Sequence, residues 1–441
     1  MKTFVAISGM FRSGTTLLSA MLNAHPNACS SADSYQPVLK EFRNAVARDV
    51  YRSFRREWKD PQAPLGDYYF DESENTLFRK IQETPFSISA RGVELESLRR
   101  AVADYAKGYS PKITGHLDRL EGGTYEAIFR SAFDIVEKAY GEGKVVTHQC
   151  TKLVWSDEFI PHFLRAFPNS RVINVIRDPR AVCASRNVYD EKYPWIFLAR
   201  QWRKLATFSW MIQNKWLDLK SRVLLVRYED LIREPEAHAK QIAAFLGLED
   251  HLSLIDAKKF TGGDGQPWHQ NSSYYADEKG PREFNPKSID KWKKILKEDE
   301  ISLIEQLCLP EMLAWNYEPI YANRRNFPES LVDKPPVIPR ERLSGWIKEY
   351  FTDDKVAAAH EMRQEQSRFA ALTDSKQACG VEAKRRYFLF EEFFDFLKAS
   401  LCNSTGDAGG ESSFARSPNA SYGRGRKSPA GGRTRRIENC N

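Results

Sequence analysis

Residues 9–16 have the sequence Gly-Met-Phe-Arg-Ser-Gly-Thr-Thr, whose residue types and spacing suit the binding of a phosphate ester. Gly9 and Gly14 frame a loop whose backbone N–H groups can surround an anion. Their spacing matches a Walker A loop, but Thr15 occupies the position of the lysine that contacts a nucleoside triphosphate in that loop. The cation is instead Arg12, inside the loop. The sequence therefore predicts a phosphate site without the lysine that reaches the β- and γ-phosphates.

A second candidate anion site lies in residues 171–186. Arg177 follows an apolar run, and Ser185 comes eight residues later, about two helical turns if the segment coils. An arginine and a hydroxyl so placed can bind one phosphate by charge and hydrogen bond. Taken alone, the same pattern also fits an Arg–Asp ion pair and an incidental serine. Together with the loop at 9–16, it favours a second phosphate site.

Strands alternating with helices are expected to position both sites. The loop follows the apolar run 4–7 and precedes a helix that Pro26 ends. This alternation predicts an α/β fold, a P-loop-type parallel sheet flanked by helices on both faces. The further predicted strands are 144–150, 171–176 and 222–227, and predicted helices are 157–167, one opening at 177–180, one ending at Gly247, and 288–316.

The chain length allows one large domain and an appendage. We expect a main domain over 1–320 with a helical insertion at 34–115, a linker and helical extension over 321–401, and a basic, disordered tail over 402–441. In the extension, one helix is predicted over 381–401, with an apolar stripe at helical spacing. The stripe fits either docking onto the main domain or contact with a partner or membrane surface. Peripheral membrane contact through 381–441 is thus left open.

Composition narrows the class of protein further. The formal net charge of +7 favours anionic ligands only weakly, and much of it lies in the tail, which has seven basic and three acidic residues over 403–441. That tail fits a solvated segment better than a nucleic-acid or lipid contact, and no nucleic-acid partner is expected. The seven cysteines are scattered without a Cys-x-x-Cys motif, which argues against a zinc site or a disulfide framework. No apolar run is long enough to span a bilayer, and a signal peptide would overlap the phosphate loop, so we expect a cytoplasmic protein.

Two phosphate sites on one sheet suit a nucleotide with phosphate at both ends of its ribose. Residues 9–16 resemble the 5′-phosphosulfate loop of the sulfotransferases, and Arg177 to Ser185 resembles their 3′-phosphate motif. The resemblance covers roughly residues 3–320. It implies 3′-phosphoadenosine 5′-phosphosulfate (PAPS) as the sulfuryl donor and no need for a metal.

The resemblance is greatest to the tyrosylprotein branch and to bacterial sulfotransferases. Residues 12–26, Arg-Ser-Gly-Thr-Thr-Leu-Leu-Ser-Ala-Met-Leu-Asn-Ala-His-Pro, resemble that branch almost throughout. Cys150-Thr151-Lys152 is similar to its Cys-Asn-Lys, with Lys152 25 residues before Arg177. The catalytic glutamate of that branch comes seven residues after its His-Pro, where this chain has Asp33, whose side chain is one methylene shorter.

The resemblance also implies roles for these residues. Arg12 and Lys152 would stabilise charge on the leaving phosphate, as in other in-line transfers. Asp33 is the first candidate for the base that takes the acceptor proton, and His148 and His269 are the alternatives. Asp33 also fits a helix cap, and the two histidines also fit a core and a loop position. The implied donor-binding residues are Arg12, Ser13, Gly14, Thr15, Thr16, Arg177, Ser185, Tyr228 and Arg282, with Ser272 and Ser273 in the loop before Trp292.

Three function classes remain open from the sequence. A PAPS-dependent sulfotransferase fits best. A P-loop kinase or NTPase would need the loop lysine, which this chain replaces with Thr15. A non-catalytic binding module would not need both phosphate sites. The insertion at 34–115 is expected to form the acceptor pocket, since its aromatic residues suit a sugar ring or a tyrosine. Its basic residues suit an anionic saccharide or a solvated helix face. A cytoplasmic location favours a saccharide, glycolipid or small-molecule hydroxyl over a protein tyrosine as the acceptor.

Overall fold

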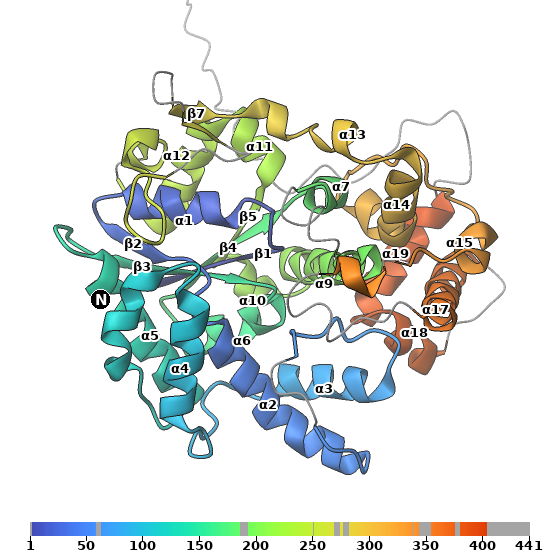
Figure 1. Cartoon of the computed structure of the whole chain (residues 1–441), viewed down its shortest axis with the longest axis horizontal. Helices are drawn as coiled ribbons and strands as arrows, with labels where there is room; N and C mark the ends of the chain where they lie inside the picture. Colours follow the sequence, from blue (N-terminus) through green and yellow to red (C-terminus); the bar gives the residue numbers. More distant parts are fainter. Residues whose placement is uncertain are drawn as a thin grey trace, which may run out of the picture. The chain divides into compact units, whose positions relative to one another are not determined.

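A parallel sheet of five strands lies at the centre of the structure (Figure 1). The computed structural model describes residues 2–58, 63–185, 193–249, 251–268, 274–276, 282–337, 339–343, 354–374 and 380–403. The described elements belong to one compact unit, Met1–Thr405. The strands are β1 (Thr3–Gly9), β2 (Ala28–Ser31), β3 (His148–Val154), β4 (Arg171–Ile176) and β5 (Val223–Arg227), in the order β2-β3-β1-β4-β5. The predicted α/β fold is confirmed.

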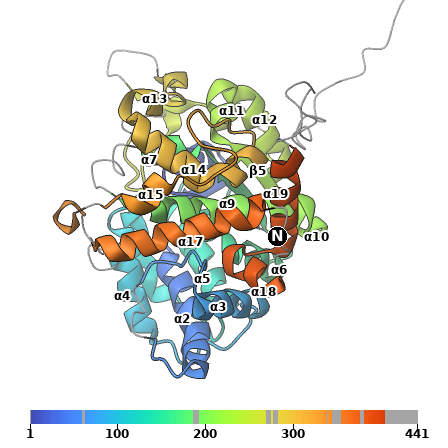
Figure 2. The same cartoon turned by 90° about the vertical axis from the view of Figure 1, so that its right-hand side faces the viewer.

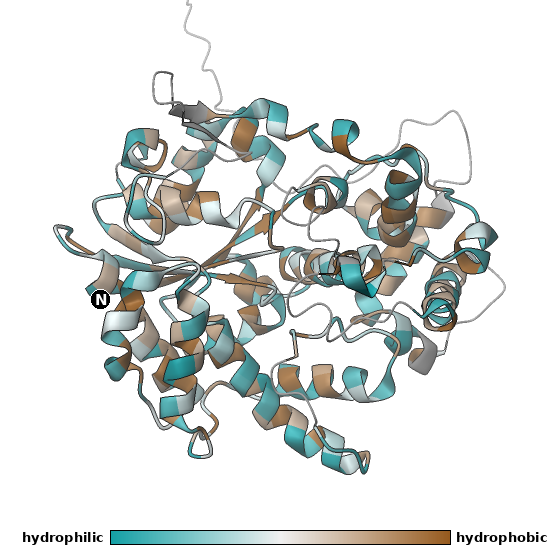
Figure 3. Ribbon diagram, viewed as in Figure 1, coloured by the Kyte–Doolittle hydropathy of each residue, from teal (hydrophilic) through white to brown (hydrophobic). Residues whose placement is uncertain are grey.

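Both faces of the sheet are covered by helices, and its middle strand β1 is coloured mainly as apolar in Figure 3. In β1, Val5 and Ile7 pack into the core on one face, while Ala6 packs into the core on the other. The helices on the first face are α1 (Thr15–Ala24), α11 (Tyr228–Arg233) and α12 (Pro235–Leu246), and on the second α5 (Tyr125–Tyr140) and α6 (Ile160–Ala166) (Figure 1).

A helical insertion separates β2 from β3. Its helices pack on α5 and α6 around buried aromatic side chains such as Phe42, Phe86 and Phe129. Two of these helices begin at side-chain caps. The Asp71 carboxylate accepts hydrogen bonds from backbone N–H groups in the first turn of α3, and the Thr124 hydroxyl accepts one from the first turn of α5. The elements of the insertion before α5 are α2 (Gln36–Ser53), α3 (Glu72–Glu83), α4 (Leu95–Ala106) and η1 (Pro111–Arg119).

The C-terminal helices pack onto the sheet domain through the long helix α9 (Trp195–Asn214). Figure 2 shows α17 (Lys355–Thr373) running alongside α9 and α14 (Glu298–Ala314). The prediction of one continuous helix over 381–401 is wrong, because this segment forms two helices, α18 (Val381–Tyr387) and α19 (Glu391–Asn403). The remaining short elements are α7 (Pro179–Cys183), α10 (Leu217–Lys220), α13 (Trp292–Ile295), α15 (Glu329–Asp333), η2 (Asp157–Phe159), η3 (Leu252–Leu254), η4 (Ala257–Lys259), η5 (Pro286–Ser288), η6 (Arg340–Arg342), β6 (Tyr274–Ala276) and β7 (Arg282–Phe284).

The apolar stripe of α19 docks onto the domain. Phe394, Leu397 and Leu401 are buried in one cluster with Trp210 of α9. The alternative of a membrane contact through this stripe is therefore wrong, because its apolar side chains are buried against protein. No helix in the described ranges has the length and apolar character needed to cross a bilayer.

Two strand predictions also need correction. The strand β2 was not predicted, and it pairs in parallel with the first residues of β3, from Ala28 beside His148 to Ser31 beside Thr151. The predicted strand 144–150 begins four residues later, at His148, and ends at Val154. Val145 lies outside the sheet and is 75% exposed, so its β-branched side chain was a misleading signal.

Candidate functional site

The loop between β1 and α1 turns sharply at the carboxyl edge of the sheet. Gly9, Arg12 and Gly14 all have positive φ angles, of 144°, 66° and 97°. A Cβ on Gly9 would lie 2.6 Å from the Val175 carbonyl oxygen, and one on Gly14 would lie 2.5 Å from the Tyr228 ring. Both positions therefore require glycine. Helix α1 begins at Thr15 with no side-chain cap, so the N–H groups of its first turn face the loop.

The structure brings the two predicted phosphate sites together. The Arg12 Nε donates to Ser185 Oγ at 2.7 Å, and the Arg177 Nη1 donates to the Arg12 carbonyl oxygen at 2.7 Å. This contact arises because β1 and β4 are parallel neighbours, with Gly9 beside Val175, so their following loops leave the same edge. Residues separated by more than 160 positions thus form one cationic cluster.

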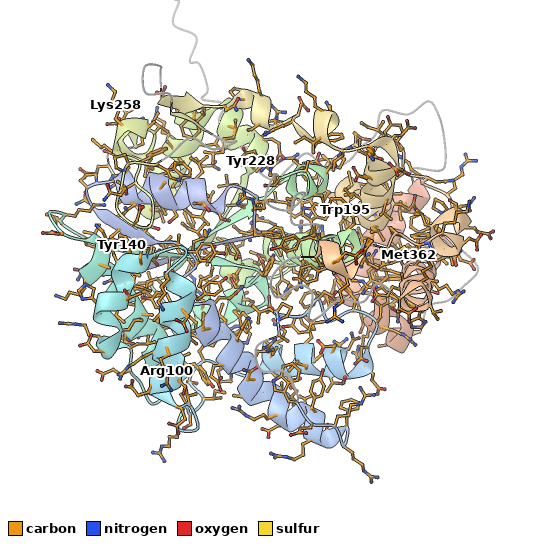
Figure 4. All side chains as sticks on the ribbon, in the orientation of Figure 1. Arg100, Tyr140, Trp195, Tyr228, Lys258 and Met362 are labelled. Carbon is orange, nitrogen blue, oxygen red and sulfur yellow. The ribbon has the colours of Figure 1, made fainter. Side chains whose placement is uncertain are left out.

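Arg177 is fixed by contacts with two further residues. Its guanidinium carbon lies 3.9 Å from the centroid of the Tyr228 ring, and its Nη2 donates to the Ser288 carbonyl oxygen at 3.3 Å. The Tyr228 hydroxyl and Ser288 Oγ are 2.8 Å apart (Tyr228 is labelled in Figure 4). The Arg177 Nε is buried and has no hydrogen-bond partner among the described residues. Because an unpaired buried donor is costly, this nitrogen is suited to an incoming anion.

Lys152 and Asp33 form a buried ion pair next to the loop. The Lys152 Nζ lies 2.6 Å from Asp33 Oδ2 and donates to Thr16 Oγ1 at 2.9 Å. Both charged side chains are 7% exposed or less. Lys152 comes from β3, Asp33 follows β2, and Thr16 belongs to the first turn of α1. The sequence-predicted carboxylate and lysine are thus brought to the same edge as the phosphate loop.

The loop residues between these charges have different surroundings. Ser13 is fully buried, and its hydroxyl and N–H both donate to the Met10 carbonyl oxygen within the loop. Its hydroxyl therefore stabilises the turn in this structure. Thr15 is also buried, with its methyl group 3.2 Å from the position that a Cβ on Gly9 would occupy.

His148 lies at the wrong end of its strand to act as the base. It begins β3 beside Thr3, whereas Lys152 near the other end lies beside Ile7. Its Nε2 is 2.9 Å from the Leu246 carbonyl oxygen, and burial lowers the pKa of its imidazole. At about 3.3 Å per residue, His148 lies more than 10 Å along the sheet from the Lys152 position. The alternative of His148 as general base is therefore wrong.

Several predicted residues lie in a loop that the structure covers only partly. His269, Ser272 and Ser273 are outside the described residues. Arg282 begins β7, which pairs antiparallel with β6, but its side chain is outside the description. Ser288, just after this loop, was not predicted, because a serine gives no sequence signal that it will meet Tyr228 and Arg177.

Two sets of aromatic side chains lie around the candidate site, Tyr105 within the influence of the Asp33 charge and a cluster on the phosphate loop. Burial raises the pKa of the Tyr105 hydroxyl, and the nearby charge of Asp33 raises it further. On the loop side, the Phe11 ring lies 4.8 Å from that of Trp155 and 5.3 Å from that of Tyr193, measured between centroids. Tyr105 comes from α4 of the insertion. Sequence reasoning anticipated aromatic residues from the insertion but did not identify Tyr105 or Tyr193.

Comparison with known proteins identifies the group to which this arrangement belongs. The model of the Sulfotransferase family matches residues 5–251, more than half of the chain. The chain belongs to this family. The match begins in β1 and runs past β5, so it contains Arg12, Asp33, Lys152, Arg177, Ser185 and Tyr228.

Individual relatives are distant. Carbohydrate sulfotransferase 3 from Tetronarce californica is 27% identical over 169 residues, which are 34% of this chain and 36% of that protein. Protein-tyrosine sulfotransferase A from Caenorhabditis elegans is 22% identical over 355 residues, which are 78% of this chain and 75% of that protein. The sulfotransferase domain from the curacin biosynthetic pathway aligns with a TM-score of 0.40 and 15% identity, over 73% of this chain and 99% of that one. The chain thus spans about a third of the carbohydrate relative.

Proposed function

We propose that this sulfotransferase uses PAPS as its donor and transfers the sulfuryl group to a hydroxyl acceptor. The observation that carries the proposal is the joining of two cationic sites at one sheet edge, through Arg12, Ser185 and Arg177. A nucleotide with phosphate at both ends of its ribose suits two such sites. The unpaired Nε of Arg177 and the uncapped N–H groups at the start of α1 fit phosphate oxygens.

The donor would be held by residues from four segments of the chain. Arg12, Ser13, Gly14, Thr15 and Thr16 would bind its 5′-phosphosulfate, and Arg177 and Ser185 its 3′-phosphate. The Tyr228 ring packs against the Arg177 guanidinium, and Arg282 is proposed as a further contact with the donor. When bound, PAPS supplies an activated sulfuryl group.

The chain's own residues would act on either side of the sulfur. Arg12 and Lys152 can stabilise the charge that develops on the phosphate as its bond to sulfur breaks. Asp33 can accept the proton of the acceptor hydroxyl as its oxygen bonds to sulfur. The ion pair with Lys152 holds this carboxylate at the edge of the sheet, next to the phosphate loop.

For the acceptor, we propose a saccharide, glycolipid or small-molecule hydroxyl. Support comes from Tyr105 of the insertion, which is close enough to Asp33 to be affected by its charge and whose ring suits the apolar face of a sugar, and from the relative named as a carbohydrate sulfotransferase. A cytoplasmic location, which stays a prediction, also favours it. The alternative is a protein tyrosine, favoured by the longer alignment with the tyrosine sulfotransferase.

Two experiments test this function. In a thermal shift assay, adenosine 3′,5′-bisphosphate should raise the melting temperature and ATP with Mg²⁺ should not; the reverse pattern would refute the donor assignment. Labelled PAPS is then offered with oligosaccharides, a glycolipid, a simple phenol and a tyrosine peptide, and mass spectrometry detects added sulfate. Sulfation of the peptide alone would establish the alternative acceptor.

A further inference from the structure

Ser110 makes two hydrogen bonds to the residue that precedes Asp33. Its side chain is fully buried between α4 and η1. Its Oγ accepts a hydrogen bond from the Ala32 N–H at 2.7 Å and donates one to the Ala32 carbonyl oxygen at 3.0 Å. One hydroxyl of the insertion therefore binds both polar groups of the backbone next to the candidate base, although 78 positions separate the two residues.

The backbone at Asp33 needs such support. Its φ angle is 46°, in the left-handed region, which is strained for a residue other than glycine. Its N–H donates to the Lys152 carbonyl oxygen at 3.1 Å, and its Oδ1 accepts from the Val154 N–H at 3.4 Å. This conformation brings Oδ2 to the Lys152 ammonium. A rotation of the preceding peptide would move the carboxylate away from it.

Ser110 is itself held firmly in place. Its N–H donates to the Ala106 carbonyl oxygen at the end of α4, at 2.7 Å. A Cβ on Gly263 would lie 1.6 Å from the Tyr109 carbonyl oxygen and 3.2 Å from the Ser110 Cα, so the backbone at 109–110 is tightly packed against that loop. The Tyr140 hydroxyl also donates to the Gly263 carbonyl oxygen. Ser110 is thus a fixed point from which a neighbouring backbone can be oriented.

We infer that Ser110 is a positioning residue for Asp33, an inference that rests on the proposed function. The insertion then has a second role beside forming an acceptor pocket. It sets the backbone geometry that pairs the base with Lys152, and it does so through one hydroxyl. No contact between Ser110 and the substrate is required.

The chain offers a matched control within the same insertion. The Ser131 hydroxyl accepts from the Glu121 N–H at 3.1 Å and is within donating distance of two carbonyl oxygens, that of Glu121 at 3.0 Å and that of Ile128 at 2.8 Å. Ser131→Ala therefore removes the same pair of bonds to one backbone residue, together with a local bond within α5. The two variants differ in the backbone that they release: Ser110→Ala releases Ala32, next to Asp33, whereas Ser131→Ala releases Glu121.

The first test is structural and needs no acceptor. In a crystal structure of Ser110→Ala, Asp33 should leave its left-handed conformation and its contact with Lys152 should open from 2.6 Å. In Ser131→Ala the ion pair should be unchanged. An intact pair in Ser110→Ala would overturn the inference. If Ser110→Ala does not bind adenosine 3′,5′-bisphosphate, the test is repeated with Ser110→Cys, whose thiol has a similar volume but forms weak hydrogen bonds. An opened ion pair would again support the inference, and an intact pair would overturn it.

The second test separates positioning from a general loss of stability. Turnover of labelled PAPS is measured with the best acceptor of the panel or, where none is sulfated, with water, read as released sulfate. For Ser110→Ala we expect kcat to fall roughly ten- to a hundredfold, because small misplacements of a base are costly, with an unchanged Kd for the bisphosphate. In an Asp33→Asn background the same change should cost nothing further. Full additivity of the two losses would overturn the inference, while a wild-type chain that binds no bisphosphate would instead refute the proposed function.

Discussion

Arg12 donates a 2.7 Å hydrogen bond from its Nε to Ser185 Oγ, joining the loop after β1 to the segment that follows α7. The two residues belong to the two sites that the sequence predicts for different phosphates. Their contact, with the bond from Arg177 to the Arg12 carbonyl, makes one continuous cationic edge across β1 and β4. A ligand that engages both sites can therefore be recognised as one unit.

Replacing Arg12 by alanine should abolish transfer and weaken binding of adenosine 3′,5′-bisphosphate by about ten- to a hundredfold. The estimate follows from hydrogen bonds to charged groups, which contribute about 1.5–3 kcal/mol each. Calorimetric titration measures the affinity, and circular dichroism checks the fold. Arg100→Ala is the control, since Arg100 is exposed on α4 (Figure 4). Equal activity in Arg12→Ala and the wild type would contradict the assigned role.

Ser185→Ala should reduce the preference for a 3′-phosphate. A hydrogen bond to a charged phosphate contributes about 1.5–3 kcal/mol, so the ratio of affinities for adenosine 3′,5′-bisphosphate and adenosine 5′-phosphate should fall roughly ten- to a hundredfold. Competition binding with the two nucleotides measures this ratio. Ser367→Ala, in the exposed surface of α17, should leave it unchanged. An equal loss for both nucleotides would place Ser185 outside the 3′-phosphate site.

Removing both charges of the Lys152–Asp33 pair should restore stability that is lost when Lys152 alone is replaced, but it should not restore activity. Lys152→Met leaves the buried Asp33 carboxylate without its partner, which typically costs about 3 kcal/mol or more. Adding Asp33→Asn removes that charge, so the double variant should regain much of the free energy of unfolding while remaining inactive. Urea unfolding and PAPS turnover provide the two measurements. A double variant less stable than Lys152→Met would show that the pair is not coupled in this way.

Local patterns were enough to predict much of this site. The glycine-framed loop, its apolar strand and the interval from Arg177 to Ser185 are short-range features, and each lies within one strand–loop–helix unit. Parallel strands then bring such units to a common edge, which is why the predicted residues meet. The strand β2 escaped prediction because Ala-Cys-Ser-Ser has little β-propensity, and its pairing with β3 decides its conformation.

Contacts between distant segments could not be predicted. Ser110 and Ser288 reach the site from residues that carry no motif, and only the packed structure shows that they meet Ala32 and Tyr228. The apolar stripe of α19 fitted both docking onto the domain and contact with a partner or membrane, since hydrophobic periodicity does not distinguish protein from lipid. The stripe packs against protein because Trp210 of α9 supplies an apolar surface that it can contact.

The C-terminal helices should contribute a pH-dependent part of the stability through Glu365 of α17. This buried carboxylate forms ion pairs with Arg200 and Arg203 of α9. Burial alone would raise the pKa of Glu365, but the charges of Arg203 and Arg200 outweigh it and lower the pKa from 4.5 to about 2. A carboxyl group with a depressed pKa stabilises the folded state above its unfolded pKa and loses that contribution as pH falls through the folded value.

We therefore expect the free energy of unfolding to decline as pH falls from 4.5 towards about 2, and Glu365→Gln to flatten this part of the decline. At neutral pH the same variant should be less stable by about 3 kcal/mol, because Arg203 loses its paired carboxylate and Arg200 keeps only the more exposed Glu361. Urea midpoints in a descending pH series measure both effects. Glu361→Gln is the control, since Glu361 also pairs with Arg200 but is 41% exposed and should cost under about 1 kcal/mol. If Glu365→Gln kept the full pH dependence of the wild type, the ion pairs of α17 would not be its source.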